Sequence, residues 1–255
     1  MSALPRTPSF RLDGRRAIVT GASRGIGLAS AVALAEAGAE VTLVARGRDE
    51  LEARAGEIRA AFGTASALPL DVGDVDAVER EIRGAGPVDI LVNNAGVSRH
   101  RPMLETRPDD FDHVISINLR AAYFVAKSVA AGIVESGRAG ATINISSQMG
   151  HVGGFDRTVY NASKHAIEGL TKPMAIELGP RHVRVNSIGP TFIKLPLTAS
   201  TLADPIRRAW IESKIKLGRL AEVEDIMGGI VFLASDAAAM ITGTSLLIDG
   251  GWTAG

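Results

Sequence analysis

The sequence predicts one doubly wound α/β domain, with a parallel sheet of about seven strands and helices on both faces. Two observations favour this fold class. Short apolar, β-branched segments alternate with helical segments along almost the whole chain, as they do in consecutive β–α–β units. The first unit also has a glycine-rich turn between its strand and its helix. We expect residues 1–10 to form a mobile tail and residues 11–255 to form the single domain.

The first β–α–β unit indicates a dinucleotide site. A strand at residues 16–20 leads into the turn Thr20-Gly-Ala-Ser-Arg-Gly-Ile-Gly27, and a helix at 28–37 and a strand at 40–46 follow. Glycine allows a tight turn and a close approach of the backbone to a pyrophosphate, whose charge is stabilised at a helix N-terminus. The G-x-x-x-G-x-G spacing differs from the commonest fingerprint but meets the same physical needs.

Two arginines in this unit favour NADP(H) as the dinucleotide. NAD sites usually have an acidic residue at the end of the second strand for the ribose hydroxyls, whereas here that strand ends in Arg46. Arg24 in the glycine turn adds a second cation, and a guanidinium suits a 2′-phosphate. The alternative is that Arg46 is a solvated charge and Arg24 caps a neighbouring helix, in which case NAD(H) would be the cofactor.

The remaining elements continue the alternation. Helices are expected where apolar residues recur at the helical period, and strands where short β-branched runs are bounded by Gly, Pro, Asn or Ser. Polar residues follow several strands, at the edge where ligands gather in an open α/β sheet. A long excursion at about 190–216 predicts a substrate loop. The expected helices are 47–63, 74–83, 108–131, 158–178 and 225–234, and the strands are 66–72, 88–92, 141–145, 183–188 and 245–249.

Composition excludes several classes of function. Hydrophobic side chains make up 46% of the 255 residues, enough for a sizeable core, and the lack of cysteine rules out disulfides, thiolate catalysis and cysteine-bound metals. The 28 Lys and Arg balance the 28 Asp and Glu, so no field of one sign favours nucleic acid or an anionic membrane as a partner. There is no apolar secretion segment and no uninterrupted apolar run of ~18 residues, so we expect a cytoplasmic protein.

Tyr160 and Lys164 are the candidate acid–base pair. They lie four residues apart on the expected helix 158–178, so they share one face, roughly 5–6 Å apart at Cβ. A nearby cation favours the phenolate and lowers the pKa of the phenol, which brings it closer to the value useful in catalysis. Ser147, after the strand 141–145, could present a hydroxyl to the same reacting oxygen. Alone, Tyr-x-x-x-Lys is a weak signal, because such a pair is usually an exposed helix contact.

Together these motifs resemble the short-chain dehydrogenase/reductase family over about residues 12–252, which implies a Rossmann-like fold. The glycine turn and the Tyr-x-x-x-Lys motif are each weak evidence for a family. Chance does not explain the occurrence of all these motifs in this order and at these separations. The segments that carry the resemblance are Thr20–Gly27, Asp71-Val72, Asn93-Asn-Ala-Gly96, Asn118, Ser147, Tyr160-x-x-x-Lys164, Asn186-Ser-Ile-Gly-Pro190 and Asp249-Gly-Gly251.

The resemblance implies a role for each matching residue. Tyr160 is the general acid in reduction and the base in oxidation, and Lys164 lowers its pKa and holds the nicotinamide ribose. Ser147 binds the substrate oxygen, and Asn118 positions a water in a proton relay; from the sequence alone, its amide could instead bond within its helix and bend it. The implied cofactor-binding residues are Gly21, Ser23, Arg24, Ile26, Gly27, Arg46, Asp71, Val72, Asn93, Ala95, Gly96, Tyr160, Lys164, Pro190 and Ile193.

The resemblance also implies a homotetramer, or a homodimer, in which the 158–178 helix and the C-terminal tail pack between subunits. Pro173 lies inside that helix, where it removes a hydrogen bond and is expected to produce a kink. Thr191 and Leu195 stand where the family has a small residue and then a threonine that contacts the nicotinamide carboxamide. The sequence therefore does not predict that hydroxyl contact.

The expected activity is NAD(P)-dependent interconversion of a secondary alcohol and a ketone. Cationic and hydrogen-bonding groups near the expected mouth favour a polar substrate such as a sugar acid or polyol, and residues 99–103 resemble the same segment of gluconate 5-dehydrogenases. The alternatives are a 3-oxoacyl thioester (acyl carrier protein) reductase and a non-catalytic NADP(H)-binding regulator. The candidate substrate residues are Arg99, Gln148, His151, Phe155, Phe192 and Trp210, any of which could instead be a solvated or packing side chain.

Overall fold

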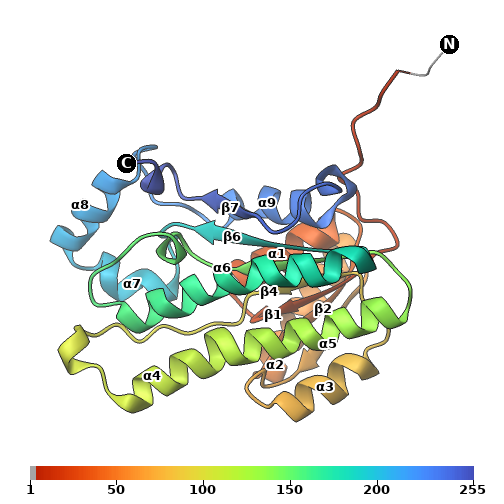
Figure 1. The fold of residues 1–255 in the computed structure, drawn as a ribbon, viewed down its shortest axis with the longest axis horizontal. Helices are drawn as coiled ribbons and strands as arrows, with labels where there is room; N and C mark the ends of the chain where they lie inside the picture. The colour runs from red at the N-terminus through yellow and green to blue at the C-terminus, as the bar shows by residue number, and fades with distance from the viewer. Residues whose placement is uncertain (1–3) are drawn as a thin grey trace.

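The computed structural model describes residues 4–255, which form one parallel sheet of seven strands in the order β3-β2-β1-β4-β5-β6-β7 (Figure 1). This confirms the predicted doubly wound class. β1 pairs with β2 on one side and with β4 on the other, so the strand order reverses between β1 and β4. The strands are β1 (Arg16–Thr20), β2 (Glu40–Ala45), β3 (Ala65–Pro69), β4 (Ile90–Asn93), β5 (Gly140–Ile145), β6 (Val183–Pro190) and β7 (Ser245–Ile248).

Helices cover both faces of the sheet and enclose two separate apolar cores. In Figure 1, α5 and α6 lie in front of the strands, whereas α1 and α9 lie behind them. The central strands read as continuous apolar runs because both of their faces are buried. The helices are α1 (Gly25–Glu36), α2 (Arg48–Phe62), α3 (Val75–Gly84), α4 (Pro108–Ile115), α5 (Ala122–Glu135), α6 (Thr158–Leu178), α7 (Pro196–Leu202), α8 (Pro205–Lys214) and α9 (Glu224–Ala234).

The observed elements differ from the predicted ones in three places that matter for the site. Helix α1 begins at Gly25 rather than at residue 28, so its N-terminus lies inside the glycine turn. β3 ends at Pro69, which leaves Asp71 in the following turn. The long helix predicted at 108–131 is α4 and α5 joined by a π-helical segment, Ser116–Ala121. Such wider turns interrupt the regular backbone ladder and are frequent at functional sites.

The joined helix Pro108–Glu135 is long and apolar enough to cross a membrane by length and composition, although the sequence predicted no such segment. Half of its most apolar window is buried within the fold, where α5 packs on α3. Residues 4–10 are exposed and form neither helix nor strand. The first three residues of the predicted tail lie outside the described residues. Helix α6 runs through Pro173 without interruption, and the kink there stays a prediction.

Candidate active site

Thr20 and Asn94 tie the glycine turn after β1 to the end of β4. The Thr20 hydroxyl accepts hydrogen bonds from the backbone N–H groups of Asn94 (2.9 Å) and Ala95 (3.0 Å), and the Asn94 side-chain amide donates to Thr20 O (2.9 Å). Gly27 packs against the same turn, because a Cβ at that position would lie 2.2 Å from Gly21 O. The crevice lies where the strand order reverses, between β1 and β4, and its packing leaves no room for a side chain at position 27.

The glycine turn opens onto the N-terminus of α1. Gly25 begins this helix with a φ of +60°, no acidic residue lies in its first turn, and no side chain of the described residues caps it. The free N–H groups of a helix N-terminus are a favourable place for an anion. The Leu195 methyl carbons lie 3.5 Å from where a Cβ of Gly25 would be, so the loop after β6 borders the turn. These residues fit the pyrophosphate of a dinucleotide.

Asn93 and Asn118 bond to the protein itself. The Asn93 amide donates to Ala122 O (2.7 Å), directly after the π-helical segment. Asn118 donates to Val97 O (2.9 Å) and Ser163 Oγ (3.1 Å), and accepts from Val97 N (2.8 Å). The intrahelical bond considered for Asn118 is thus wrong. Its amide instead holds the loop after β4 against α6, the helix that carries Tyr160.

One pocket brings several of the predicted residues together. Tyr160 from α6, Ser147 from the end of β5, and Gln148 and Phe192 all line it. The Gln148 amide is buried, and neither its oxygen nor its nitrogen has a hydrogen-bond partner within residues 4–255. Such an amide suits a polar group of a bound molecule. The lining residues are Ser98, His100, Ser147, Gln148, Met149, Arg157, Tyr160, Thr191, Phe192 and Thr198.

Lys164 is buried behind Tyr160 and does not line the pocket. Its ammonium donates to Ile145 O (2.8 Å) and lies 5.7 Å from the centre of the Tyr160 ring. Burial raises the pKa of Tyr160 above its ordinary value, against a hydrogen bond with Ser147 and the charge of Arg157. The Lys164 ammonium is directed at a backbone carbonyl, and Arg157 is the cation that opposes this rise, so a lowering of the Tyr160 pKa by Lys164 stays a prediction.

The buried Lys164 predicts a pH-dependent stability. Burial lowers the pKa of Lys164 from 10.5 to about 8, and Glu168 acts in the opposite direction. Between about pH 8 and pH 10.5, Lys164 is still protonated in the unfolded chain but has lost its proton in the folded protein. The contribution of Lys164 to the unfolding free energy therefore rises with pH in this range. We expect the unfolding free energy of the wild type, relative to Lys164→Met, to rise by about 2 kcal/mol between about pH 7.5 and about pH 9.5. Urea denaturation measures this, and a pH-independent difference contradicts it.

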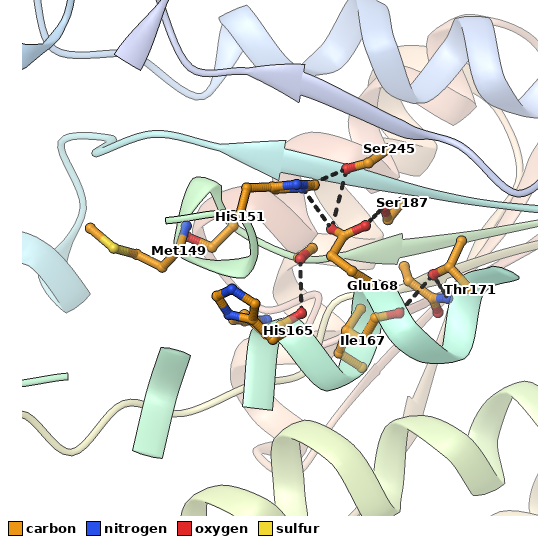
Figure 2. Close-up of polar contacts among 12 residues, drawn as sticks. Met149, His151, His165, Ile167, Glu168, Thr171, Ser187 and Ser245 are labelled. Atoms are coloured by element: carbon orange, nitrogen blue, oxygen red, sulfur yellow. Dashed lines mark hydrogen bonds and ion pairs between the residues drawn. The ribbon is translucent and has the colours of Figure 1, made fainter. Parts of the chain in front are cut away.

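His151 points toward a polar cluster that contains Glu168, Ser187 and Ser245 (Figure 2). Its Nε2 lies 3.3 Å from Glu168 Oε1 and 3.0 Å from Ser245 Oγ, and the Glu168 carboxylate also accepts from Ser187 Oγ at 2.7 Å. The cluster joins the single helical turn after Ser147 to α6, β6 and β7. His151 is therefore not among the residues that line the pocket, whereas the sequence analysis expected it to contact the substrate.

The predicted aromatic walls form one continuous group with an additional member, Trp252. Ring centres are 5.6 Å apart for Phe155 and Trp210, 5.5 Å for Trp210 and Trp252, and 5.6 Å for Trp252 and Phe192. Of these four aromatic residues, Phe192 alone lines the pocket. Phe155 and Trp210 are connected to Phe192 by ring contacts through Trp252. Arg99 is exposed and does not line it.

Known proteins match almost the whole chain. The family model described as "Enoyl-(Acyl carrier protein) reductase" matches residues 21–253. L-xylulose reductase from Bos taurus is 41% identical over 245 residues, which cover 96% of this chain and 99% of that protein. The chain belongs to the short-chain dehydrogenase/reductase family.

Two solved structures show how closely this short-chain dehydrogenase/reductase keeps the fold. A proposed NAD(P)-dependent gluconate 5-dehydrogenase from Beutenbergia cavernae, with bound NADP, is 39% identical with a TM-score of 0.93, covering 96% of this chain and 99% of that one. A gluconate 5-dehydrogenase from Burkholderia cenocepacia, in complex with NADP and tartrate, is 34% identical with a TM-score of 0.94, covering 96% and 98%.

The candidate cofactor residues of this family member lie along the carboxyl edge of the sheet. Arg24 and Arg46 are exposed after β1 and β2, and neither forms an ion pair within residues 4–255. Asp71 accepts from Gly73 N (2.9 Å) in the turn after β3, beside the buried Val72. The remaining candidates line the same edge: Ser23 and Ile26 in the glycine turn, Ala95 and Gly96 after β4, Pro190 at the end of β6 and the buried Ile193.

Sequence reasoning missed several residues that the structure adds to the site. Asn94 holds the glycine turn, and Ser98 lines the pocket from the loop after β4, next to His100, one of the cationic or hydrogen-bonding groups expected near the mouth. Trp252 follows a turn in which the Asp249 carboxylate accepts from Gly251 N (2.9 Å). A tryptophan directly after two glycines was the available signal for Trp252, whereas Ser98 carried no signal of its own.

Proposed function

We propose that this protein interconverts a secondary alcohol and a ketone with NADP(H), on a polar, polyhydroxylated substrate such as a sugar, sugar acid or polyol. The observation that carries the proposal is the shared pocket of Tyr160, Ser147 and the unpartnered Gln148 amide. The names of the relatives support it, since L-xylulose reductase and gluconate 5-dehydrogenase both refer to small hydroxylated compounds.

The side chains of the pocket account for proton transfer. When bound, the nicotinamide supplies or accepts the hydride. In reduction, Tyr160 donates its phenolic proton to the substrate oxygen as negative charge develops there, and in oxidation it accepts the proton. Because burial favours the protonated phenol, Tyr160 is held in the form that reduction needs. Ser147 hydrogen-bonds the same oxygen, which stabilises the developing charge. Lys164 is proposed to hold the nicotinamide ribose.

Arg24 and Arg46 are proposed to bind the 2′-phosphate of NADP(H). Charge-assisted hydrogen bonds contribute about 1.5–3 kcal/mol each, so we expect Arg24→Ser with Arg46→Ser to weaken NADPH binding roughly 100-fold or more. NADH affinity should stay within about threefold, because NADH lacks that phosphate. Fluorescence titration with both cofactors measures this, and Arg80→Ser, an exposed arginine on α3, is the control. An equal loss for both cofactors would place the arginines at the pyrophosphate instead.

We also propose a homotetramer, with a homodimer as the smaller assembly. A groove between α5 and α6 is lined by apolar side chains such as Ala130, Leu170 and Met174, and Ile176 nearby is 75% exposed. Apolar surface of this kind is typical of contacts between subunits. Light scattering after size-exclusion chromatography measures the mass, and a monomer would contradict the proposal. We propose a cytoplasmic location, which cell fractionation tests.

The function itself is tested by a cofactor titration followed by a substrate panel. The wild type should bind NADPH more tightly than NADH and should oxidise or reduce polyols, ketoses or sugar acids with the preferred cofactor. A 3-oxoacyl thioester belongs in the panel, since a preference for it would reject a sugar-type substrate. Binding of NADPH without turnover of any carbonyl or alcohol would favour a non-catalytic regulator.

A further inference from the structure

Arg157 places a positive charge in the pocket without a carboxylate partner. It lies at the N-terminus of α6, three residues before Tyr160, and is partly buried. Within residues 4–255, Asp156 is the acid whose charge reaches Arg157, but its carboxylate forms its ion pair with Arg207 (2.9 Å). Burial of a charge costs free energy unless the charge is paired, so an unpaired guanidinium in a pocket indicates a missing anion.

The groups that do touch Arg157 are all neutral. Its Nη1 donates to His100 Nε2 (2.9 Å), its Nη2 lies 3.4 Å from Thr201 Oγ1, and its guanidinium stacks 4.9 Å from the centre of the Phe192 ring. Burial and the charge of Arg157 lower the pKa of His100 to about 4, so His100 is neutral at physiological pH. Ser98 hydrogen-bonds the same His100 nitrogen. These contacts fix the guanidinium in place, and none of them supplies a carboxylate that pairs with its charge.

Arg157 lines the same pocket as Tyr160 and Ser147, the proposed reacting groups. Its charge favours the phenolate of Tyr160, which places the guanidinium within electrostatic reach of the phenol. Two further polar groups of the pocket are buried and unpartnered within the described chain, the Gln148 amide and the Thr191 hydroxyl. The pocket thus presents one cation and two hydrogen-bonding groups beside the Tyr160 phenol. A short hydroxylated chain that ends in an anion matches these groups.

We propose that Arg157, oriented by His100, binds a carboxylate of the substrate, and that the enzyme prefers hydroxy and keto acids of the aldonate type to neutral sugars and polyols. The proposal rests on the proposed oxidoreductase function and deepens it by naming the substrate class. A planar guanidinium binds a carboxylate through two parallel hydrogen bonds, which fixes the distance between the carboxylate and the carbon that reacts. Gln148 and Thr191 take hydroxyl groups of the chain.

The test compares aldonates with the alditols of the same length and stereochemistry, which differ only in carboxylate against hydroxymethyl. We expect wild-type kcat/KM to be at least about tenfold higher for the best aldonate. Arg157→Gln should raise KM for aldonates about 100-fold, and the loss of kcat/KM should be at least about 30-fold larger for aldonates than for the matched alditols. Arg157→Lys should retain part of the aldonate activity, because lysine keeps the positive charge but cannot form the two parallel hydrogen bonds of a guanidinium.

A charge-matched control separates a local role from a general field. Arg208→Gln removes an exposed guanidinium of α8 that pairs with Glu212 (2.9 Å), and should leave both substrate classes unchanged. An equal loss for aldonates and alditols in Arg157→Gln would overturn the proposal and show that Arg157 acts through Tyr160. Wild-type turnover of alditols alone would overturn this inference but keep the oxidoreductase function. Turnover of neither class, together with no other carbonyl or alcohol, would overturn both.

Discussion

Tyr160→Phe is expected to lower kcat by about 10²–10⁴-fold, because the reaction loses its general acid and base while the ring stays in place. NADPH should still bind with an affinity close to that of the wild type. Since the lost interaction with the substrate oxygen strengthens in the transition state, kcat and kcat/KM should fall together. Steady-state kinetics in both directions, with fluorescence titration of NADPH, measure these quantities.

The matched control is Tyr123→Phe, because the chain has only two tyrosines. Tyr123 lies on α5 with 42% of its surface exposed, so removal of its hydroxyl should leave kcat unchanged. Thermal denaturation of both variants shows whether the fold is intact. A kcat for Tyr160→Phe within a factor of ten of the wild type would reject Tyr160 as the proton donor.

Gly27→Ala should destabilise the protein by about 2–4 kcal/mol and weaken NADPH binding by two orders of magnitude. A Cβ at this position would lie 2.2 Å from Gly21 O and 2.5 Å from the Asn94 Nδ2, well inside van der Waals contact. The Asn94 amide donates to Thr20 O and Gly21 O, and Ala22 N next to Gly21 donates to Val44 O, so relief requires the turn itself to move. Urea denaturation and NADPH titration measure the two effects.

Gly56→Ala is the control for this substitution and should have the opposite sign. Gly56 lies on α2, and beyond the backbone of that helix the atom nearest to an added Cβ is Arg59 Nη2 at 3.8 Å, the end of a flexible side chain. Alanine inside a helix is more favourable than glycine by about 0.5–1 kcal/mol, so this variant should be slightly more stable. If Gly27→Ala and Gly56→Ala had equal stability, close packing of the turn would not be the reason for glycine at position 27.

The amide side chains show where sequence reasoning succeeds and where it stops. The segment Asn93-Asn-Ala-Gly96 was correctly expected at the carboxyl end of a strand, because a buried apolar run precedes it. The sequence did not indicate which of the two amides, Asn93 or Asn94, faces the glycine turn. Asn93 turns inward to Ala122 O, and Asn94 bonds Thr20 across 74 positions of sequence. Neighbouring residues of an extended segment point to opposite sides, and only the paired strand decides which side holds the crevice.

Local spacing therefore determined the alternation of strands and helices, the glycine turn and the presence of Tyr160 and Ser147 in one site, because each depends on residues close in sequence or on one strand end. The tertiary structure alone decided that Arg157 meets His100, that His151 turns to Glu168, and that Lys164 donates to Ile145 O. These side chains leave loops or helix ends in directions set by packing against distant segments. The electrostatic effect of a charged side chain at such a position depends on its distance from other groups and on its burial, and the linear sequence specifies neither.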